Sequence, residues 1–398
     1  MTELSGKRIV LGVTGGVAAY KAAELTRLLV KSGATVDVAL TAAGSRFVGA
    51  ATFQALSGRP VWTDLWDTRP DNGMAHIDLT RGADACVVAP ASADFMAKLA
   101  HGLADDLLST LCLARACPLL VAPAMNRQMW ESPATQRNVA QLLGDGIALL
   151  GPASGEQACG EEGFGRMLEA AEVFDEIVAF LQTKIMSGRC VLLTVGPTFE
   201  AVDPVRGLTN RSSGRMGFAL ARAFRDAGAA VTVVAGPTEQ PVPRGVARID
   251  VTSALEMRAA VRQALSGKQV FVGVAAVADY RPAAVATHKI KKSSAPMTLD
   301  LEPNPDILAE VAALPNAPFC VGFAAESRDL AGYAEAKRKS KKLPLVVGNL
   351  IADGLGGETN IVTLFDDKGV HPLPPGDKLT VARDIVSHIA GMIDPCTV

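Results

Sequence analysis

The feature that most constrains this chain is the alternation of short apolar segments with helix-like segments over most of its length. Such alternation predicts an α/β fold, in which helices cover both faces of a parallel sheet. In the first half, the predicted strands are Arg8–Val13, Val36–Leu40, Asp84–Ala89 and Leu119–Ala122. The predicted helices are Ala18–Val30, Arg46–Leu56, a helix that starts at Ser132-Pro133, and Met167–Lys184.

A second start of the same kind divides the chain. The segment CVLLTVGPT follows Arg189 and is similar to RIVLGVTGG near the N-terminus, since each is an apolar strand followed by a glycine-containing turn. Further strands are predicted at Ala230–Ala235, Val270–Val274, Phe319–Phe323 and Leu345–Val347. We therefore predict two doubly wound α/β domains, residues 1–186 and 187–398, each able to bind a ligand beyond the carboxyl ends of its strands.

Charge and cysteine spacing argue against several classes of protein. The formal net charge of −2 disfavours a general nucleic-acid-binding protein. The seven cysteines include no C-x-x-C pair, which disfavours a zinc site or a disulfide framework and suits a reducing cytoplasm. No apolar run reaches the roughly 18 residues of a membrane span, and the N-terminus shows no signal peptide. These patterns predict a cytoplasmic protein that binds neither nucleic acid nor membrane.

Small and polar residues follow the predicted strands of the first half. The pair Gly15-Gly16 follows the first strand, where glycines let a phosphate approach a helix N-terminus, although a plain tight turn fits the pair equally well. Thr41 follows the second strand, and Ser92 and the pair Met125-Asn126 follow strands that end in Ala-Pro. Because the carboxyl ends of parallel strands meet at one edge of a sheet, these residues predict a shared crevice.

Two further residues have side chains capable of acid–base chemistry. His76 lies between small and apolar residues in GMAHIDL, and Cys159 lies in GEQACGEEGFGR, a loop whose glycines would allow a lid to move. The residues alone favour a structural role for His76. They leave Cys159 equally compatible with an ordinary exposed thiol.

The order of these segments resembles one family of flavoproteins. GVTGGVAAYK, MAHIDL, APASAD, APAMN and SGEQACGEEGFGRM span residues 9 to about 168, and together they resemble the flavin-containing cysteine decarboxylases, in particular the phosphopantothenoylcysteine decarboxylases. The resemblance implies a flavodoxin-like domain that binds FMN through Gly15, Gly16, Thr41, Ser92 and Met125. It also implies His76 as the base, Asn126 as the group that binds the substrate carboxylate, and Cys159 as the proton donor.

The implied chemistry is consistent with these roles. Direct loss of the carboxylate from an N-acyl cysteine would leave a carbanion with no electron sink. Oxidation of the thiol to a thioaldehyde places a C=S group β to the carboxylate, and FMN is suited to accept the hydride and to return it after carbon dioxide has left. A thiol that donates the final proton needs no lowered pKa.

The second half carries a long polar segment and two basic runs. Residues 196–217 follow a strand and lead into a helix at Phe218, and Ser212-Ser213-Gly214 offers an anion site at that helix N-terminus. This predicted loop has neither a Walker nor a G-x-G-x-x-G pattern. A buried strand, VGVAAVADYRP, is predicted to end in Asp279 and Tyr280, and EPNPDIL predicts a helix start at Pro305-Asp306. The basic runs THKIKK and Lys337–Lys342 are compatible with two interpretations. They are either solvent-exposed surface segments or two groups of cations that converge on a triphosphate.

These segments resemble the phosphopantothenate–cysteine ligases in their bacterial fused form. The matches extend over residues 194 to about 349, and the order of the two halves also agrees. The resemblance implies a role in coenzyme A biosynthesis, with CTP as co-substrate, Mg²⁺, and an acyl-cytidylate of 4′-phosphopantothenate that the amine of cysteine captures. It assigns Lys289 to the α-phosphate, Asn210 to the acyl-cytidylate and Arg206 to the capture step. It places at the CTP site Asp279, Pro305, Asp306, Ile307, Leu308, Phe323, Lys337 and Lys341, and leaves the Mg²⁺ ligands unassigned.

Other interpretations stay open at this level. Some relatives of the flavin half are FMN-binding regulatory subunits without activity of their own, and a flavin prenyltransferase-like protein would leave the second half unexplained. An NAD-dependent dehydrogenase ranks last, because neither half shows G-x-G-x-x-G followed by an acidic residue at the expected distance. The resemblance implies a homo-oligomer, a dodecamer of trimeric flavin domains and dimeric ligase domains, whose active sites can form between subunits.

Overall fold

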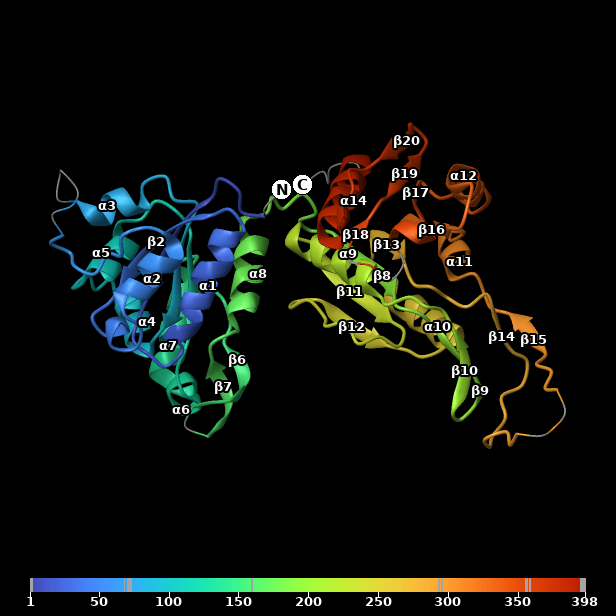
Figure 1. Cartoon of the computed structure of the whole chain (residues 1–398), viewed down its shortest axis with the longest axis horizontal. Helices are drawn as coiled ribbons and strands as arrows, with labels where there is room; N and C mark the ends of the chain where they lie inside the picture. Colours follow the sequence, from blue (N-terminus) through green and yellow to red (C-terminus); the bar gives the residue numbers. More distant parts are fainter. Residues whose placement is uncertain are drawn as a thin grey trace. The chain divides into compact units, whose positions relative to one another are not determined.

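The computed structural model describes residues 3–67, 69, 74–158, 160–292, 294, 296–354, 357 and 359–393. The chain divides into two compact units, Met1–Leu181 and Gln182–Val398 (Figure 1). Each unit has its own sheet and its own hydrophobic core. Among the described residues, every helix is too short or too polar to cross a bilayer.

The first unit is built on a five-stranded parallel sheet with the strand order β2-β1-β3-β4-β5. Its strands are β1 (Arg8–Val13), β2 (Thr35–Leu40), β3 (Ala85–Ala91), β4 (Leu119–Pro123) and β5 (Ala148–Leu149). This order is that of flavodoxin-like folds, so the predicted topology is confirmed. In such a sheet the winding reverses between β1 and β3, which is where a ligand crevice forms.

Helices cover both faces of this sheet because its strands are apolar on both sides. In β1, Ile9, Leu11 and Val13 belong to the core under α1 (Ala19–Lys31), α2 (Ala50–Ser57) and α8 (Ala170–Leu181). Val10 belongs to the opposite core, under α3 (Ala75–Thr80), α4 (Ala93–His101), α5 (Leu107–Ala114) and α7 (Pro133–Gly144).

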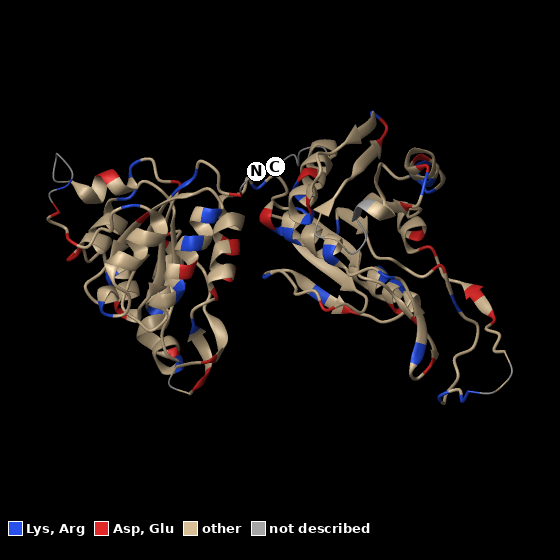
Figure 2. Ribbon diagram, in the orientation of Figure 1, with Lys and Arg blue, Asp and Glu red and all other residues tan. Residues whose placement is uncertain are grey.

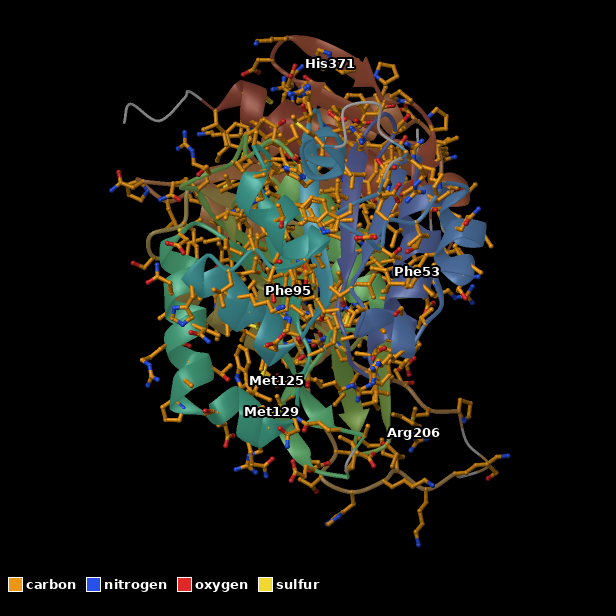
Figure 3. The ribbon with its side chains drawn as sticks, turned by 90° about the vertical axis from the view of Figure 1, so that its left-hand side faces the viewer. Phe53, Phe95, Met125, Met129, Arg206 and His371 are labelled. Atoms are coloured by element: carbon orange, nitrogen blue, oxygen red, sulfur yellow. The ribbon has the colours of Figure 1, made fainter. Side chains whose placement is uncertain are left out.

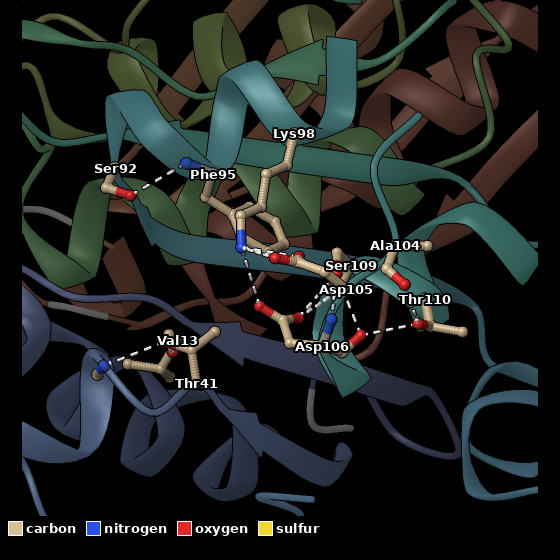
Figure 4. Close-up of polar contacts among 11 residues, drawn as sticks. Val13, Thr41, Ser92, Phe95, Lys98, Ala104, Asp105, Asp106, Ser109 and Thr110 are labelled. Carbon is tan, nitrogen blue, oxygen red and sulfur yellow. Dashed lines mark hydrogen bonds and ion pairs between the residues drawn. The ribbon is translucent and has the colours of Figure 1, made fainter. Parts of the chain in front are cut away.

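Side-chain caps fix where two helices of the second face begin. Ser92 accepts a hydrogen bond from the Phe95 amide and starts α4, while Asp106 caps α5 (Figure 4). Lys98 of α4 pairs with Asp105 at 2.8 Å and lies 3.6 Å from Asp106. These contacts hold the start of α5 against α4, while the bond from the Phe95 amide orients the Ser92 hydroxyl just after β3.

Two elements of the first unit differ from the sequence prediction. The predicted helix Arg46–Leu56 is replaced by a 3₁₀ turn, η1 (Gly44–Arg46), and by α2, because Gly49 has an extended backbone and α2 starts only after it. The segment GEQACGEEGFGR, predicted as a loop, instead contributes residues to two paired strands, β6 (Ala153–Glu156) and β7 (Glu162–Arg166). This antiparallel hairpin contacts α6 (Arg127–Glu131).

The second unit contains an eight-stranded sheet with the order β12-β11-β8-β13-β16-β17-β19-β20. Its parallel strands are β8 (Cys190–Val195), β11 (Ala230–Ala235), β12 (Ala247–Asp250), β13 (Val270–Gly273), β16 (Phe319–Glu326) and β17 (Leu345–Leu350). The antiparallel strands β19 (Thr363–Asp366) and β20 (Gly369–Pro372) complete one edge. The parallel strands follow the Rossmann order, which confirms the predicted fold and places the switch point between β8 and β13.

Two layers of helices cover this sheet. One layer contains α9 (Arg215–Asp226) and α14 (Lys378–Met392), and the other contains α10 (Ala254–Ala264), α11 (Ile307–Ala312) and α12 (Leu330–Ser340). A short helix, α13 (Ile351–Gly354), follows β17, and the strands β18 (Thr359–Asn360) and β21 (Gly376–Asp377) pair before α14.

A hairpin and an arm leave the second sheet. The hairpin pairs β9 (Phe199–Asp203) with β10 (Arg206–Thr209), inside the segment predicted as a long loop. Strand β14 (Tyr280–Pro282) pairs with β15 (Leu301–Pro303), and the described residues between them, 283–292, 294 and 296–300, are called the arm (Figure 1). The prediction that one strand continues to Asp279 was wrong. Strand β13 ends at Gly273, because the chain then turns so that Ala276 bonds to Gly196 and Thr198 instead.

Three polar side chains tie the β19–β20 edge to α14. The buried Asp366 carboxylate lies 3.0 Å from His371 Nε2 of β20 and 2.9 Å from His388 Nε2 of α14. Burial acts to raise the pKa of Asp366, but the hydrogen bonds from the two imidazoles outweigh it and lower the pKa to about 2. Asp366 is therefore ionised at neutral pH.

Acid is expected to weaken this edge. Because the pKa of Asp366 is about 2 in the folded chain and 3.8 ordinarily, its contribution to the free energy of unfolding is complete above 3.8 and is lost as the pH falls toward 2. We expect the Asp366→Asn variant to lose less stability over this range than the unaltered chain, as measured by urea denaturation at each pH. The exposed Asp300→Asn variant is the control. Equal pH dependence of all three proteins would contradict the prediction.

Candidate active sites

The carboxyl ends of β1, β3 and β4 open into a cavity of about 620 Å³ in the first unit. This volume lies in the range of small-molecule and cofactor sites. The walls come from the turn after β1, the starts of α1, α4 and α6, and the β6–β7 hairpin. The predicted site residues that line it are Gly15, Gly16, Ser92, Met125 and Asn126. Residues from three separate strand ends therefore face one volume.

Close packing fixes the strand ends beneath this cavity. The buried Thr14 hydroxyl donates to the Pro90 carbonyl oxygen at 2.8 Å and accepts from the Ser92 amide at 3.0 Å. A Cβ on Gly15 would lie 2.7 Å from the Ala43 Cβ, so glycine is what allows the turn after β1 to approach the loop after β2. Gly15 thus has a structural role as well as a place in the cavity wall.

The N-terminus of α1 lines the cavity, and no described side chain caps it. The first turn of α1 also holds no acidic residue, so the positive end of the helix dipole remains available to an anion. Lys21, which no sequence motif marks as a site residue, lies on α1 and lines the same cavity. Its buried Nζ donates to the Met167 carbonyl oxygen at 3.0 Å and to Glu169 at 2.9 Å, and this bond lowers the pKa of Glu169.

Asn126 lines the cavity from the start of α6. Its side chain accepts from the Met129 amide at 3.0 Å, and its amide nitrogen donates to Gln128 at 2.8 Å. Met125 and Met129 lie close to each other beside it (Figure 3). The Met125 amide donates to the Gly165 carbonyl oxygen at 3.0 Å, so the β6–β7 hairpin supports this wall of the cavity.

Three residues proposed for the flavin site are not placed in this cavity. Thr41 accepts from the Gly44 amide at 3.0 Å and donates to the Val13 carbonyl oxygen, so it shapes the loop after β2 instead. His76 lies on α3, at the other end of the unit from α6 in Figure 1, and its buried Nδ1 has no hydrogen-bond partner among the described residues. Cys159 lies outside the described residues.

A smaller pocket, of about 130 Å³, lies at the switch point of the second unit. The turn after β8, the start of α9, the segment after β13, and Phe323 of β16 line it. Gly214, the N-cap of α9, has a φ of +77°, a conformation that favours glycine. Ser212 and Ser213 precede it and also line the pocket. Two hydroxyls at the positive end of a helix form an arrangement suited to an anion.

The β9–β10 hairpin and the residue after it position two of the predicted residues. Asn210 donates through Nδ2 to the carbonyl oxygen of Ala276, which lines the pocket, at 2.9 Å. Arg206 donates through Nε to the buried carboxylate of Asp203 at 3.0 Å. The hydrogen bond from Arg206 holds the pKa of Asp203 well below its usual range.

Asp203, which was not predicted as a site residue, also anchors the arm. Its Oδ2 accepts from the Ile290 amide at 3.1 Å, and the Arg206 guanidinium donates to the Ile290 carbonyl oxygen. Ile290 is the neighbour of Lys289, whose side chain is exposed. Figure 2 shows Lys and Arg positions, in blue, along the ribbon at the end of the arm.

A second basic group lies beside the pocket, at the end of α12. Lys337 donates to the carbonyl oxygen of Phe323 at 2.6 Å, and Lys341 pairs with Asp306 at 2.5 Å. Burial lowers the pKa of Lys337, and the charge of Lys341 lowers it further, while Asp306 and Asp279 act in the opposite direction. The structure thus brings Lys337, Lys341 and Asp306 close to one another, with Lys337 bonded to the backbone of Phe323.

The segment Pro305–Leu308 is fixed by the start of α11. Asp306 caps this helix by accepting from the Ala309 amide at 3.0 Å, as the predicted helix start requires. Ile307 and Leu308 are buried in the core. They can therefore offer a ligand only their backbone groups.

The two basic runs do not meet within one chain. Figure 1 places α12 in the upper part of the second unit and the arm in the lower part. That both runs converge on one triphosphate stays a prediction.

Two more polar residues line the pocket, although the sequence did not predict them as site residues. Asn360 is 4% exposed, and its Oδ1 has no hydrogen-bond partner among the described residues. Lys378, the first residue of α14, donates to the Gly357 carbonyl oxygen. No motif marks either residue, because each reaches the pocket only through the packing of α14 and β18.

Comparisons with known proteins match both units. Residues 1–182 match the family model named Flavoprotein, and residues 186–392 match the DNA/pantothenate metabolism flavoprotein C-terminal domain. A coenzyme A biosynthesis bifunctional protein CoaBC from Vibrio cholerae is 49% identical over 392 residues, which are 97% of this chain and 98% of that protein. The proteins of the same name from Escherichia coli and Bacillus subtilis are 44% and 41% identical, with 98% of each chain covered.

Proposed function

Because the chain belongs to the family of coenzyme A biosynthesis bifunctional proteins, an enzyme family with a ligase and a decarboxylase activity, we propose which unit carries each activity. Residues 1–186 decarboxylate phosphopantothenoylcysteine. Residues 187–398 join 4′-phosphopantothenate to cysteine. The observation that carries the first assignment is the 620 Å³ cavity, in which an uncapped helix N-terminus, Lys21 and Asn126 share one volume.

The cavity of the first unit suits FMN. The positive end of α1 beside Gly15 and Gly16 matches the charge of the phosphate. A Cβ on Gly16 would meet no atom within 4 Å, so the backbone there is open to a ligand. Ser92 and Met125 would then lie along the flavin. When bound, FMN supplies the two-electron acceptor and donor that thiol oxidation and its reversal require.

The chain's own groups would hold the substrate and move its protons. Asn126 would bind the substrate carboxylate through its amide NH₂, after exchanging its present bond to Gln128. A neutral amide holds the carboxylate without a positive charge that would oppose the departure of carbon dioxide. His76 would take the thiol proton, and Cys159 would donate the final proton.

These roles require His76 from a second copy, since one chain does not place it in its own cavity. Exposed apolar side chains around the cavity mouth, Val17, Tyr20 and Met129, are suited to such a contact. The proposed assembly is the dodecamer of trimers and dimers, located in the cytoplasm. Light scattering on the purified protein measures its mass.

Mixing two inactive variants tests the shared site. We expect His76→Asn and Asn126→Ala each to abolish decarboxylation. After dissociation and random reassembly of a trimer, about a quarter of the sites would combine an intact His76 with an intact Asn126 from the next chain. If subunits exchange and no activity returns, the site lies within one chain.

For the ligase we propose CTP and Mg²⁺ as the co-substrate and the metal. Ser212, Ser213 and the α9 N-terminus would hold phosphate oxygens, and Lys289 would stabilise the charge that develops on the α-phosphate. Asn210 would hold the acyl-cytidylate, and Arg206 would assist its capture by cysteine. The 130 Å³ pocket is smaller than typical cofactor sites, which supports completion of the site by the arm of a second chain.

One assay tests both assignments. The purified protein is incubated with 4′-phosphopantothenate, cysteine, CTP and Mg²⁺, and the products are followed by mass spectrometry. We expect 4′-phosphopantetheine, CMP, pyrophosphate and carbon dioxide. Accumulation of phosphopantothenoylcysteine alone would remove the decarboxylase assignment, and lack of CTP consumption would remove the CTP assignment. ATP in place of CTP is the matched control.

Loss of the Asp203 charge is expected to weaken the ligase selectively. In the structure, Asp203 Oδ2 accepts hydrogen bonds from Arg206 and from the Ile290 amide. In Asp203→Asn, an amide nitrogen can take the place of Oδ2, and it cannot accept either bond. We expect ligase kcat/KM to fall at least about 10-fold, because both Arg206 and the arm lose their position. Decarboxylation of supplied phosphopantothenoylcysteine should not change. An equal loss of both activities would indicate general unfolding instead.

A further inference from the structure

Three metal-ligating side chains meet at the β19–β20 edge of the second unit. Asp366 ends β19, His371 lies on β20 and His388 lies on α14, and one ligand atom from each lies within 4.8 Å of the others. Figure 3 labels His371 at one end of the unit and Arg206 at the other. The proposed ligase chemistry therefore makes no use of these three residues.

The carboxylate is the preorganised member of the group. Asp366 is 4% exposed, and its Oδ1 accepts from the Lys368 and Gly369 amides at 2.7 and 3.0 Å. These bonds hold the carboxylate in one orientation. The two imidazole Nε2 atoms then lie 3.0 and 2.9 Å from its two oxygens.

The spacing is close to that of a metal site. Ligand atoms around a tetrahedral Zn²⁺, each about 2.0–2.2 Å from the ion, are roughly 3.4 Å apart. The imidazole rings are tilted by 50° with centroids 5.0 Å apart, so they are not stacked on each other. Small rotations of His371 and His388 would open the space for an ion between them and Asp366.

We propose that Asp366, His371 and His388 bind a divalent transition-metal ion, Zn²⁺ above all. Two imidazoles and a carboxylate suit zinc, whereas Mg²⁺ prefers oxygen ligands alone. Each neutral imidazole can carry its proton on Nδ1, which leaves the Nε2 lone pair for the ion. The His371 and His388 side chains are 36% and 24% exposed, so water can supply a fourth ligand.

Such an ion would cross-link β19, β20 and α14, and so add to the contacts that the sheet already provides. Strands β19 and β20 form the last pair of the sheet, and α14 begins with Lys378 in the ligase pocket. Zinc would therefore raise the thermal stability of the second unit.

The test uses the full chain freed of metal by a chelator. Zn²⁺ alone is titrated into it at neutral pH by isothermal titration calorimetry, and thermal unfolding is recorded with and without Zn²⁺. The test variant is His371→Gln/His388→Gln. The matched control is His101→Gln, which removes an exposed histidine at the end of α4.

We expect the unaltered chain and the control to bind one more Zn²⁺ per chain than the test variant, and to unfold at a higher temperature with Zn²⁺. Acidification should remove the difference, because protons compete for the imidazoles. Cysteine-bound zinc would add equally to all three proteins. Equal zinc stoichiometry in all three would overturn the proposal. If the double variant fails to fold by circular dichroism, His388→Gln alone should bind at least about 10-fold more weakly, and unchanged affinity would overturn the proposal equally.

Discussion

Replacing Gly165 by alanine is expected to lower decarboxylation at least about 100-fold, because the cavity wall that contains Asn126 would be displaced. Gly165 has a φ of +127°, which side chains rarely adopt, and a Cβ there would lie 2.6 Å from the Met125 carbonyl oxygen. Neither atom belongs to a flexible side-chain end, so the backbone must shift. The hydrogen bond from Met125 to Gly165 and the adjoining Asn126 would shift with it.

The measurement is flavin absorbance per chain, together with product formation from phosphopantothenoylcysteine. We expect loss of both, with ligase activity retained. Gly144→Ala is the matched control, because a Cβ at this α7 position would meet no atom within 4 Å and alanine favours helix. A Gly165→Ala protein with full flavin and full decarboxylation would show that this wall does not form the site.

Replacing Lys289 by methionine is expected to lower ligase activity at least about 100-fold, the usual effect of removing one group that stabilises transition-state charge. The methionine keeps much of the length of lysine and removes its charge. Since Lys289 is exposed on the arm, the change should leave the fold intact. Decarboxylation of supplied phosphopantothenoylcysteine should be unaffected.

The arm provides its own control for this experiment. Lys292 is also exposed and lies three residues further along. If position on the arm matters, Lys292→Met should retain most of the ligase activity. Equal losses in the two variants would show that the arm contributes only general positive charge, and the assignment of Lys289 to the α-phosphate would then be withdrawn. The salt dependence of KM would distinguish this case, because a general field is screened by salt.

The fold could be predicted closely because apolar periodicity is a local signal. Strands such as Arg8–Val13 and Ala230–Ala235 have the predicted bounds, since each is a buried apolar run between turn residues. The β9–β10 hairpin was missed because its strands are short and its polar residues look like a loop. Its pairing depends on Asp203, whose partners include a residue far along the chain, Ile290.

The candidate sites could be predicted only where residues follow strand ends. Gly15, Ser92 and Asn126 do so, and the parallel sheet brings them together. Lys21 and Asn360 reach their pockets through helix packing and a crossing strand, which no local pattern encodes. His76 shows a different limit of prediction. Its proposed partner is the cavity of a second copy, and neither the sequence nor the fold of one chain gives the distance between His76 and that cavity.

Each unit is made from one uninterrupted stretch of chain, first Met1–Leu181 and then Gln182–Val398. The sheet that contains β1 takes every strand from the first stretch, so it needs nothing from the second. Ribosomes add about 5–20 residues per second, and domains generally fold in the order of their synthesis. The first unit would therefore have roughly 10–40 seconds to fold before the second is complete. Its cavity would be ready to take up a flavin while the rest of the polypeptide is still being translated.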